Sequence, residues 1–331
     1  MPASGGIVPS GAPIGGATAQ ASDSDGHFMA FGEDNINPEV VEVLKPTITD
    51  PYHLNDDGCH LVYASNQGLT DSYYDQIDYP IDAYTASCYE RIYDVIPLER
   101  RRLLLDVCCG TGRVAINVMK HHGFQQCIAI DINATAVRRM KAVATDHDLG
   151  SIQPVIMNIM KTGFAENSFD CVMGSSFLHH LPRNLDFLIE MHRILKPGGV
   201  LCLACEPTTS APLLEDFFFR PFRAAFKSVL QKLRSRHGSE RQVCLSDIWL
   251  YDQQSLDEML RKAGFRLVII QPFGLALTLV NKPLMLLCRY MLRRNWIPHV
   301  VHKWLSSMDR LAARVVPANL FSHFTIIARK G

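Results

Sequence analysis

The fold of this chain is decided by one stretch, Leu103-Leu104-Leu105-Asp106-Val107-Cys108-Cys109-Gly110-Thr111-Gly112-Arg113-Val114-Ala115. It begins as a short apolar run of the length of a buried strand, and it then breaks into a turn with two glycines. The apolar residues that follow fit one side of a helix. A strand, a glycine turn and a helix open the nucleotide-binding α/β domains, because glycine lets a ligand approach the backbone and the helix N-terminus offers free N–H groups.

The glycine spacing differs from the dinucleotide-binding pattern, whose third glycine would fall at Ala115. Taken alone, the two glycines are equally compatible with a structural turn that holds no ligand. Residues further along the chain decide between these alternatives.

The segment Asp106-x-x-x-Gly110-x-Gly112 resembles the first motif of class I S-adenosylmethionine-dependent methyltransferases. Further stretches resemble the later motifs of that family in the correct order: Ile128-Ala129-Ile130-Asp131, Asn158, Asn167-Ser168-Phe169-Asp170, Leu178-His179-His180-Leu181, Arg193-Ile194-Leu195-Lys196-Pro197-Gly198-Gly199 and Ala263-Gly264-Phe265. The resemblance covers roughly residues 100–272 and a final strand near 321–330. It implies an α/β fold, with a Rossmann-like seven-stranded methyltransferase sheet, helices on both faces, added helical segments, and S-adenosyl-L-methionine as the cofactor.

The periodicity of the core alternates between strand and helix, which predicts a parallel sheet with helices on both faces. We expect strands near 103–108, 126–131, 153–157, 169–174, 199–205, 266–271 and 322–329, and helices near 112–122, 134–146, 184–195 and 254–263. The resemblance implies that the last strand runs antiparallel and lies beside the sixth.

The remaining segments surround this core. Few large apolar residues occur at the N-terminus, so we predict a disordered or weakly ordered tail over residues 1–45. We divide the rest into an N-terminal helical lid over 46–99, the methyltransferase core over 100–272 with an insertion at 208–245, a helical insertion over 273–318, and the last core strand within 319–331.

The resemblance places the cofactor against the turns that follow the first four strands. It assigns cofactor contacts to Asp106, Cys108, Gly110, Gly112, Asp131, Ile132, Asn158, Ile159 and Ser175. The acid at 131 would accept hydrogen bonds from the ribose hydroxyls, and the acid at 106 would orient the amino-acid end. Two positions depart from the family pattern: a cysteine replaces the usual glycine at 108, and an asparagine replaces an acid at 158. An amide oxygen can still accept a hydrogen bond from the adenine amino group.

The candidate catalytic residues follow the fourth and fifth strands. His179 and His180 lie where ligands bind in open α/β folds, and either could take a proton from a hydroxyl or amine acceptor. Glu206 is a third candidate. The alternative is that the histidines cap a helix or pack. For acceptor binding we predict Tyr73, Tyr74, Phe177 and Trp304, each of which could equally be an ordinary packing residue.

The segment 273–318 is strongly basic, with seven Lys and Arg residues and one acid, Asp309. Its second half has an apolar stripe at helical spacing, which suits either packing on the core or contact with a membrane surface. Because the segment follows the sixth strand, we expect it to form one wall of the acceptor pocket.

The charge distribution and the absence of long apolar runs bear on where the protein is located and on what it binds. The formal net charge is zero, yet the first 90 residues hold 14 acids and one base. Residues 91–331 therefore carry an excess of Lys and Arg. These basic residues either lie against the acidic first 90 residues or face an anionic partner. The N-terminus lacks the pattern of a secretory signal or transit peptide, and no apolar run reaches the ~18 residues of a spanning helix. We therefore expect a cytoplasmic protein that could lie at the periphery of a membrane.

The ten cysteines are scattered, which favours a reducing compartment. Cys202 and Cys205 have a metal-like spacing, but in a strand residues three apart point to opposite faces. We therefore predict no metal site.

These observations predict methyl transfer from S-adenosylmethionine to a small, lipophilic acceptor. No Asn/Asp-Pro-Pro-aromatic motif follows the fourth strand, which disfavours amide or base nitrogens as acceptors, and no DNA contact is expected. The alternatives are an RNA methyltransferase that uses the basic segment Arg220–Arg241 and a cofactor-binding scaffold without activity. The oligomeric state is not predicted.

Overall fold

The computed structural model describes residues 35–38, 40–50, 52–66, 95–211, 245, 247–276, 279–280, 284 and 299–331. Several predictions lie wholly or partly outside these residues: the acceptor contacts of Tyr73 and Tyr74, residues 1–34 of the tail, residues 67–94 of the lid, most of the insertion at 208–245 with the basic segment Arg220–Arg241, and residues 285–298 of the helical insertion.

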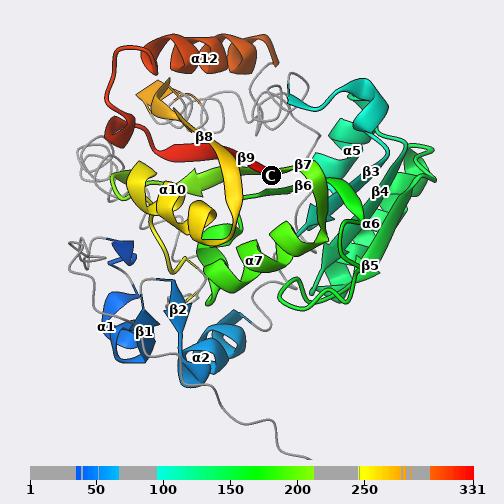
Figure 1. Cartoon of the computed structure of the whole chain (residues 1–331). Coiled ribbons are helices and arrows are strands. Elements are labelled where there is room, and N and C mark those ends of the chain that lie inside the picture. The colour runs from blue at the N-terminus through cyan, green and yellow to red at the C-terminus, as the bar shows by residue number, and fades with distance from the viewer. Residues whose placement is uncertain are drawn as a thin grey trace, which may run out of the picture. The chain divides into compact units, whose positions relative to one another are not determined.

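A seven-stranded sheet forms the centre of the fold, in the order β5-β4-β3-β6-β7-β9-β8 (Figure 1). Its strands are β3 (Leu103–Val107), β4 (Gln126–Asp131), β5 (Ile152–Ile156), β6 (Phe169–Ser175), β7 (Leu195–Pro207), β8 (Phe265–Phe273) and β9 (His323–Lys330). All neighbours pair in parallel except β9, which is antiparallel to both β7 and β8. The predicted seven strands and the antiparallel last strand are confirmed.

Helices cover both faces of this sheet. Four of them are α5 (Arg113–His121), α6 (Ala134–Asp146), α7 (Asn184–Ile194) and α10 (Gln253–Lys262). Side chains alternate along β3, so Leu104 packs in the core cluster of α5 and α6, whereas Leu105 packs in the cluster of α7 and α10. Both leucines are fully buried, and burial of a side chain of this size stabilises the fold by roughly 1.5–3 kcal/mol.

The strand directions bring several turns to one edge of the sheet. The carboxyl ends of β3, β4 and β6 meet there, because Val107 pairs with Ile130 and Asp106 with Met173. β8 also ends at this edge, since it and β7 are both antiparallel to β9. Open α/β sheets bind ligands at this edge.

The described residues between 35 and 66 contain more secondary structure than the sequence suggested. They contain α1 (Val41–Leu44), a two-stranded pair β1 (Ile48–Asp50) and β2 (His53–Leu54), and α2 (Asp56–Asn66). The predicted end of the tail at residue 45 was too late, because Ile36 bridges to Trp249 and both Val40 and Leu44 are buried. The expected helical lid also includes strands, and β2 pairs through Leu54 N–H with the carbonyl of Pro182.

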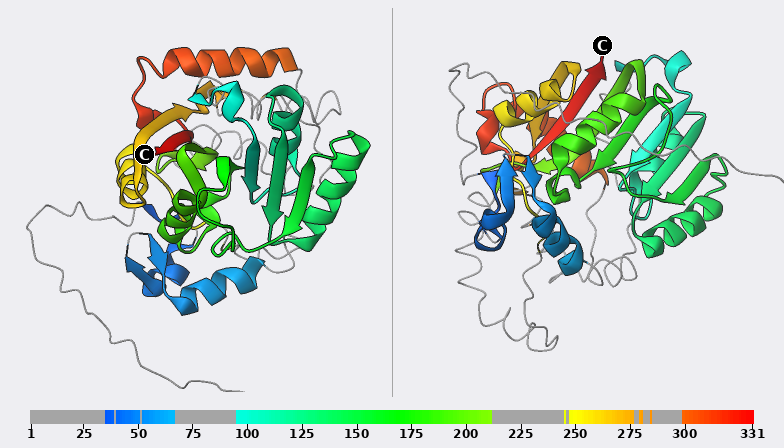
Figure 2. Two further views of the ribbon diagram at one scale, coloured as in Figure 1. Left: turned by 45° about the vertical axis from the view of Figure 1, so that its right-hand side comes forward. Right: turned by 60° about the horizontal axis from the view of Figure 1, so that its bottom comes forward.

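A long helix, α12 (His299–Ala312), lies near the end of β8 (Figures 1 and 2). Among the α12 side chains whose burial is described, Leu305 and Asp309 are the buried ones, 3% and 4% exposed. The Asp309 carboxylate accepts hydrogen bonds from the backbone N–H groups of Gly274, at 2.9 Å, and Ala276, at 2.7 Å. These two bonds fix α12 to the carboxyl edge of the sheet. Over the described part of the chain, no helix is long and apolar enough to cross a membrane.

The placement of two cysteines on β7 differs from the prediction. The register of β7 shifts between Leu203 and Glu206, and Cys205 has a positive φ of 62°. This irregularity turns Cys205 toward the same core cluster as Cys202. The expectation of opposite faces was therefore wrong, because it assumed a regular strand.

Candidate active site

The glycine turn after β3 has a tightly constrained backbone. Cys109 N–H donates to the Ile130 carbonyl at 3.0 Å, and Gly112 N–H donates to the Cys109 carbonyl at 2.8 Å. Gly112 has φ of 83°, and an added Cβ would lie 2.6 Å from Cγ of Met140. Both the conformation and the space therefore require glycine at 112. Cys108 also has a positive φ, of 50°, where the family most often has glycine.

Asp131 joins this turn to the end of β4. One carboxylate oxygen accepts from Gly110 N–H at 2.9 Å, and the other accepts from Asn133 N–H at 2.8 Å. Burial raises the pKa of Asp131, and these N–H donors oppose that rise. A carboxylate has about four acceptor positions. Asp131 therefore keeps the capacity to accept hydrogen bonds from two adjacent hydroxyls.

Asp106 is buried at 1% exposure and accepts one hydrogen bond, from Ala115 N–H at 3.2 Å. Burial raises the pKa of Asp106 to about 8, with the nearby charge of Asp131 contributing to the rise. A cationic group bound at this edge would restore the charged form of Asp106, because opposite charges stabilise each other strongly in a buried site.

The other predicted cofactor residues occupy different environments. Ser175 ends β6, and its buried hydroxyl has no hydrogen-bond partner among the described residues. A bound ligand group would satisfy it. Asn158 is exposed, and its amide oxygen already accepts from Met160 N–H. Ile132 is 63% exposed beside Asp131, whereas Ile159 is buried in the core. The constrained turn, the carboxylates and the orphaned hydroxyl together fit an adenosyl cofactor.

Glu206 anchors the short 3₁₀ turn η4 (Leu178–His180), which follows β6. Its carboxylate accepts from the backbone N–H groups of Phe177, Leu178 and His179, each at 3.2 Å, and contacts His179 Nδ1 at 2.8 Å. Glu206 is fully buried. Burial alone would raise its pKa, but the pKa lies below the usual value because His179 and these N–H donors stabilise the charge.

His179 is 6% exposed, and burial together with the neighbouring His180 lowers its pKa. An ionised Glu206 next to a neutral imidazole fixes the tautomer of His179. Nδ1 carries the proton and donates a hydrogen bond to the Glu206 carboxylate. Nε2 therefore has an available lone pair.

Asp247 completes this cluster, and sequence reasoning missed it. Its carboxylate oxygen lies 3.1 Å from His180 Nδ1 and 3.7 Å from His179 Nε2. Asp247 follows the histidines by 67 residues and belongs to no recognisable motif, so only the tertiary structure brings it here. Within the described residues, these three form the one group with metal-ligand atoms all within 4.8 Å of one another.

Two predicted acceptor residues differ in their surroundings. Phe177 is 3% exposed and packs edge-to-face on Phe187, with ring centroids 5.3 Å apart. It is therefore a core residue that holds the base of the η4 turn. Trp304 is 60% exposed on α12.

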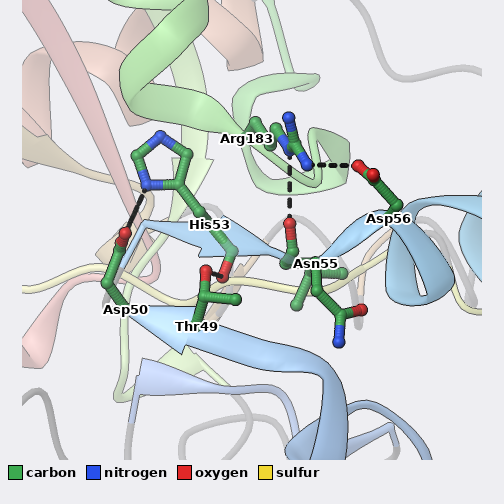
Figure 3. Close-up of a pocket in the computed structure, with 7 residues that line it drawn as sticks. Thr49, Asp50, His53, Asn55, Asp56 and Arg183 are labelled. Atoms are coloured by element: carbon green, nitrogen blue, oxygen red, sulfur yellow. Dashed lines mark hydrogen bonds and ion pairs between the residues drawn. The ribbon is translucent and has the colours of Figure 1, made fainter. Parts of the chain in front are cut away.

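An open pocket of about 330 Å³, lined mainly by polar residues, lies between residues 49–56 and the start of α7 (Figure 3). His53 contacts Asp50 through Nδ1 at 2.7 Å and Asp186 through Nε2 at 3.2 Å. Arg183 pairs with Asp56 at 2.6 Å and donates to the Leu54 carbonyl. These groups pair with one another across the pocket. They join the N-terminal segment to the chain three residues after His180.

The sheet order, the glycine turn and the acid at the end of β4 define a class of enzyme. This chain belongs to the class I S-adenosylmethionine-dependent methyltransferases. A family model for the methyltransferase domain matches residues 105–203. The cofactor is therefore S-adenosyl-L-methionine, and the enzyme transfers its methyl group to a small-molecule acceptor.

Named relatives share this core. The demethylmenaquinone methyltransferase of Geobacillus kaustophilus is 30% identical over 196 residues, which is 54% of this chain and 78% of that protein. The enzyme of the same name from Lactococcus lactis is 31% identical over 205 residues, 58% of this chain and 75% of that protein. A solved phosphoethanolamine N-methyltransferase 2 from Haemonchus contortus, in complex with S-adenosyl-L-methionine, has a TM-score of 0.46 at 15% identity, covering 79% of this chain and 60% of that one.

Proposed function

We propose that the acceptor is a lipophilic, hydroxylated aromatic ring of the demethylmenaquinone type, and that the enzyme meets it in peripheral contact with a membrane. The support is the name shared by two relatives at 30% and 31% identity, each matched over at least three quarters of its length. The retained turn, carboxylates and histidine pair suit the same reaction.

The hydrogen bond between Glu206 and His179 Nδ1 carries the mechanistic part of the proposal. Because Glu206 is buried and already engaged by four donors, we assign it a positioning role in place of the proton-transfer role. His179 Nε2 then removes the proton of the acceptor hydroxyl. The resulting oxyanion raises the electron density of the ring for the attack on the methyl carbon.

The electron balance of the transfer is simple. The cofactor supplies a methyl group on a sulfonium. A bond forms between the acceptor and the methyl carbon while the carbon–sulfur bond breaks, and its electron pair stays on sulfur. The protein contributes alignment of the two reactants and the proton transfer at His179. If ring carbon is the attacked atom, its C–H proton leaves afterwards and restores the aromatic ring.

The two alternative functions gain nothing from the comparisons. The basic segment Arg220–Arg241, on which RNA methylation would depend, lies outside the described residues. The relatives carry the name of a methyltransferase, which lends no support to a scaffold without activity.

The direct test is incubation of the full chain with S-adenosylmethionine carrying a labelled methyl group. The acceptors compared are reduced demethylmenaquinone with a short tail, the same ring fully methylated, and total RNA. Label in the first, confirmed by the mass of one added methyl group, is the expected result. Label in RNA alone would favour the RNA methyltransferase. Absence of label in every acceptor, from a protein that still binds the cofactor, would favour the scaffold without activity.

A further inference from the structure

α12 carries an exposed stripe of large apolar side chains. Val300, Trp304, Met308 and Leu311 are 75%, 60%, 41% and 65% exposed. Their spacing of four, four and three residues places them along one side of the helix. This stripe is distinct from the buried side, where Leu305 is 3% exposed. Packing on the core, the alternative that the sequence left open for the apolar residues of this segment, applies to Leu305 but not to these four residues.

In α12 and the turn that follows it, the basic side chains are exposed, whereas the acid lies on the buried side of the helix. Lys303, Arg310 and Arg314 are all exposed. The single acid of residues 273–318, Asp309, points inward and accepts the backbone N–H groups of Gly274 and Ala276. The exposed surface therefore combines apolar side chains with positive charge and no carboxylate from this segment.

From these two observations we infer that the stripe of α12 and its flanking cations dock on the surface of an anionic lipid bilayer. A helix of this kind lies in the plane of the interface, with apolar residues among the acyl chains and basic residues at the lipid headgroups. Trp304 suits such a depth, because its indole has a large apolar body and one polar N–H. The stripe spans about 16 Å along the helix, from a rise of about 1.5 Å per residue.

A second copy of the chain is a poorer occupant of the same surface. A two-fold dimer would place the patch against itself. Lys303 and Arg314 would then face an identical set of cations, and residues 273–318 supply no exposed acid to compensate them. An anionic bilayer supplies the charge that a second copy lacks.

This inference rests on the proposed membrane contact and names its surface. α12 is attached to the carboxyl edge of the sheet, where the cofactor turns and η4 also lie. Docking there would bring a lipophilic acceptor from the bilayer to the same edge as His179. The exposure of Trp304 favours this role over the pocket wall predicted from the sequence.

The test is flotation of the full chain with vesicles of phosphatidylcholine alone or with about one third phosphatidylglycerol, at low and high salt. We expect co-flotation with the anionic vesicles at low salt, and at least a tenfold loss at high salt, because salt screens exposed charges. Lys303→Glu with Arg314→Glu, and separately Val300→Ser with Leu311→Ser, should each reduce bound protein at least fivefold.

Matched changes elsewhere provide the controls. Arg138→Glu with Lys141→Glu alters two exposed cations on α6, and Ile189→Ser alters a 48% exposed apolar residue on α7. Both controls should float like the unaltered protein. In a Trp296→Phe background the two remaining tryptophans are Trp249, which is buried, and Trp304. Emission should shift to shorter wavelength on anionic vesicles in that background, and a further Trp304→Phe change should abolish the shift.

Three results would overturn the inference: no co-flotation at low salt, equal losses in the α6 control, or a dimer that the Val300→Ser, Leu311→Ser variant dissociates. Turnover of a water-soluble acceptor separates this inference from the proposed chemistry. The Lys303→Glu, Arg314→Glu variant should keep that turnover while losing flotation, whereas failure of the chemistry would abolish turnover and leave flotation intact.

Discussion

Glu206 Oε2 lies 2.8 Å from His179 Nδ1, and this contact joins the end of β7 to the turn after β6. The same carboxylate accepts three consecutive backbone N–H groups, so the position of the imidazole and the path of its turn are set together. His179 can therefore present Nε2 with little reorganisation, which is the condition for efficient proton transfer.

Replacement of His179 should separate catalysis from cofactor binding. We expect His179→Ala to lower kcat by about 10²-fold or more, the usual contribution of a general base, and to leave the Kd of S-adenosylmethionine within about twofold. Steady-state kinetics and calorimetry provide the two measurements. His60→Ala, an exposed histidine on α2, is the matched control. Turnover of His179→Ala within threefold of normal would remove the base assignment.

Glu206→Gln tests positioning through the pH profile. The Glu206 charge raises the pKa of His179, against the lowering by burial and by His180. Loss of that charge should lower the pKa further, so the acidic limb of kcat/KM should move to lower pH while kcat itself falls. A purely structural role would reduce kcat without moving the limb.

Cofactor affinity should depend on pH through Asp106, whose pKa is about 8 in the absence of ligand. The charged carboxylate favours the cationic amino-acid end of the cofactor, so binding should release a proton. Affinity should weaken by up to about tenfold per pH unit as the pH falls below about 8. Calorimetry in buffers of different ionisation enthalpy measures the proton release, and Asp106→Asn should abolish both effects. Proton uptake on binding would contradict this assignment.

Gly112→Ala should destabilise the protein by about 1–3 kcal/mol, because an L-residue is strained at φ of 83° and its Cβ would meet Met140. Denaturant unfolding measures the change. Gly150→Ala is the control, since nothing lies within 4 Å of a Cβ at that position. It should change the free energy of unfolding by less than about 0.5 kcal/mol. Equal effects of the two substitutions would show that the turn is not constrained as described.

Metal removal should leave turnover unchanged. His179, His180 and Asp247 could hold a cation by distance, but the proposed reaction uses the first of them as a base. We expect the same kcat after dialysis against a chelator and after addition of Zn²⁺ or Mg²⁺ at equimolar level. A loss of activity that added metal restores would instead assign these three residues to a metal site.

The core could be predicted because its signals are local. The apolar run Leu103–Val107 predicted a buried strand, and the glycines after it predicted a turn, in which Gly112 has a φ of 83°. Local periodicity likewise located α5, α6, α7 and α10 to within a few residues. Predictions failed where the regular alternation of side chains along a strand is broken. At the irregular end of β7, this break turns Cys205 toward the same core cluster as Cys202.

The sequence by itself determined the class of enzyme, the positions of the seven core strands and the glycine turn after the first of them, because apolar runs, glycine positions and motifs are local features of the chain. Tertiary structure alone decided three features. Asp247 lies beside the histidine pair, the Glu206 carboxylate accepts four hydrogen bonds, and Asp309 points inward on α12. Each of these features joins residues 27 to 67 positions apart, which only the packed sheet brings into hydrogen-bond range. The period of apolar residues and the spacing of motifs along the chain carry no information about which distant groups will meet at one edge of the sheet.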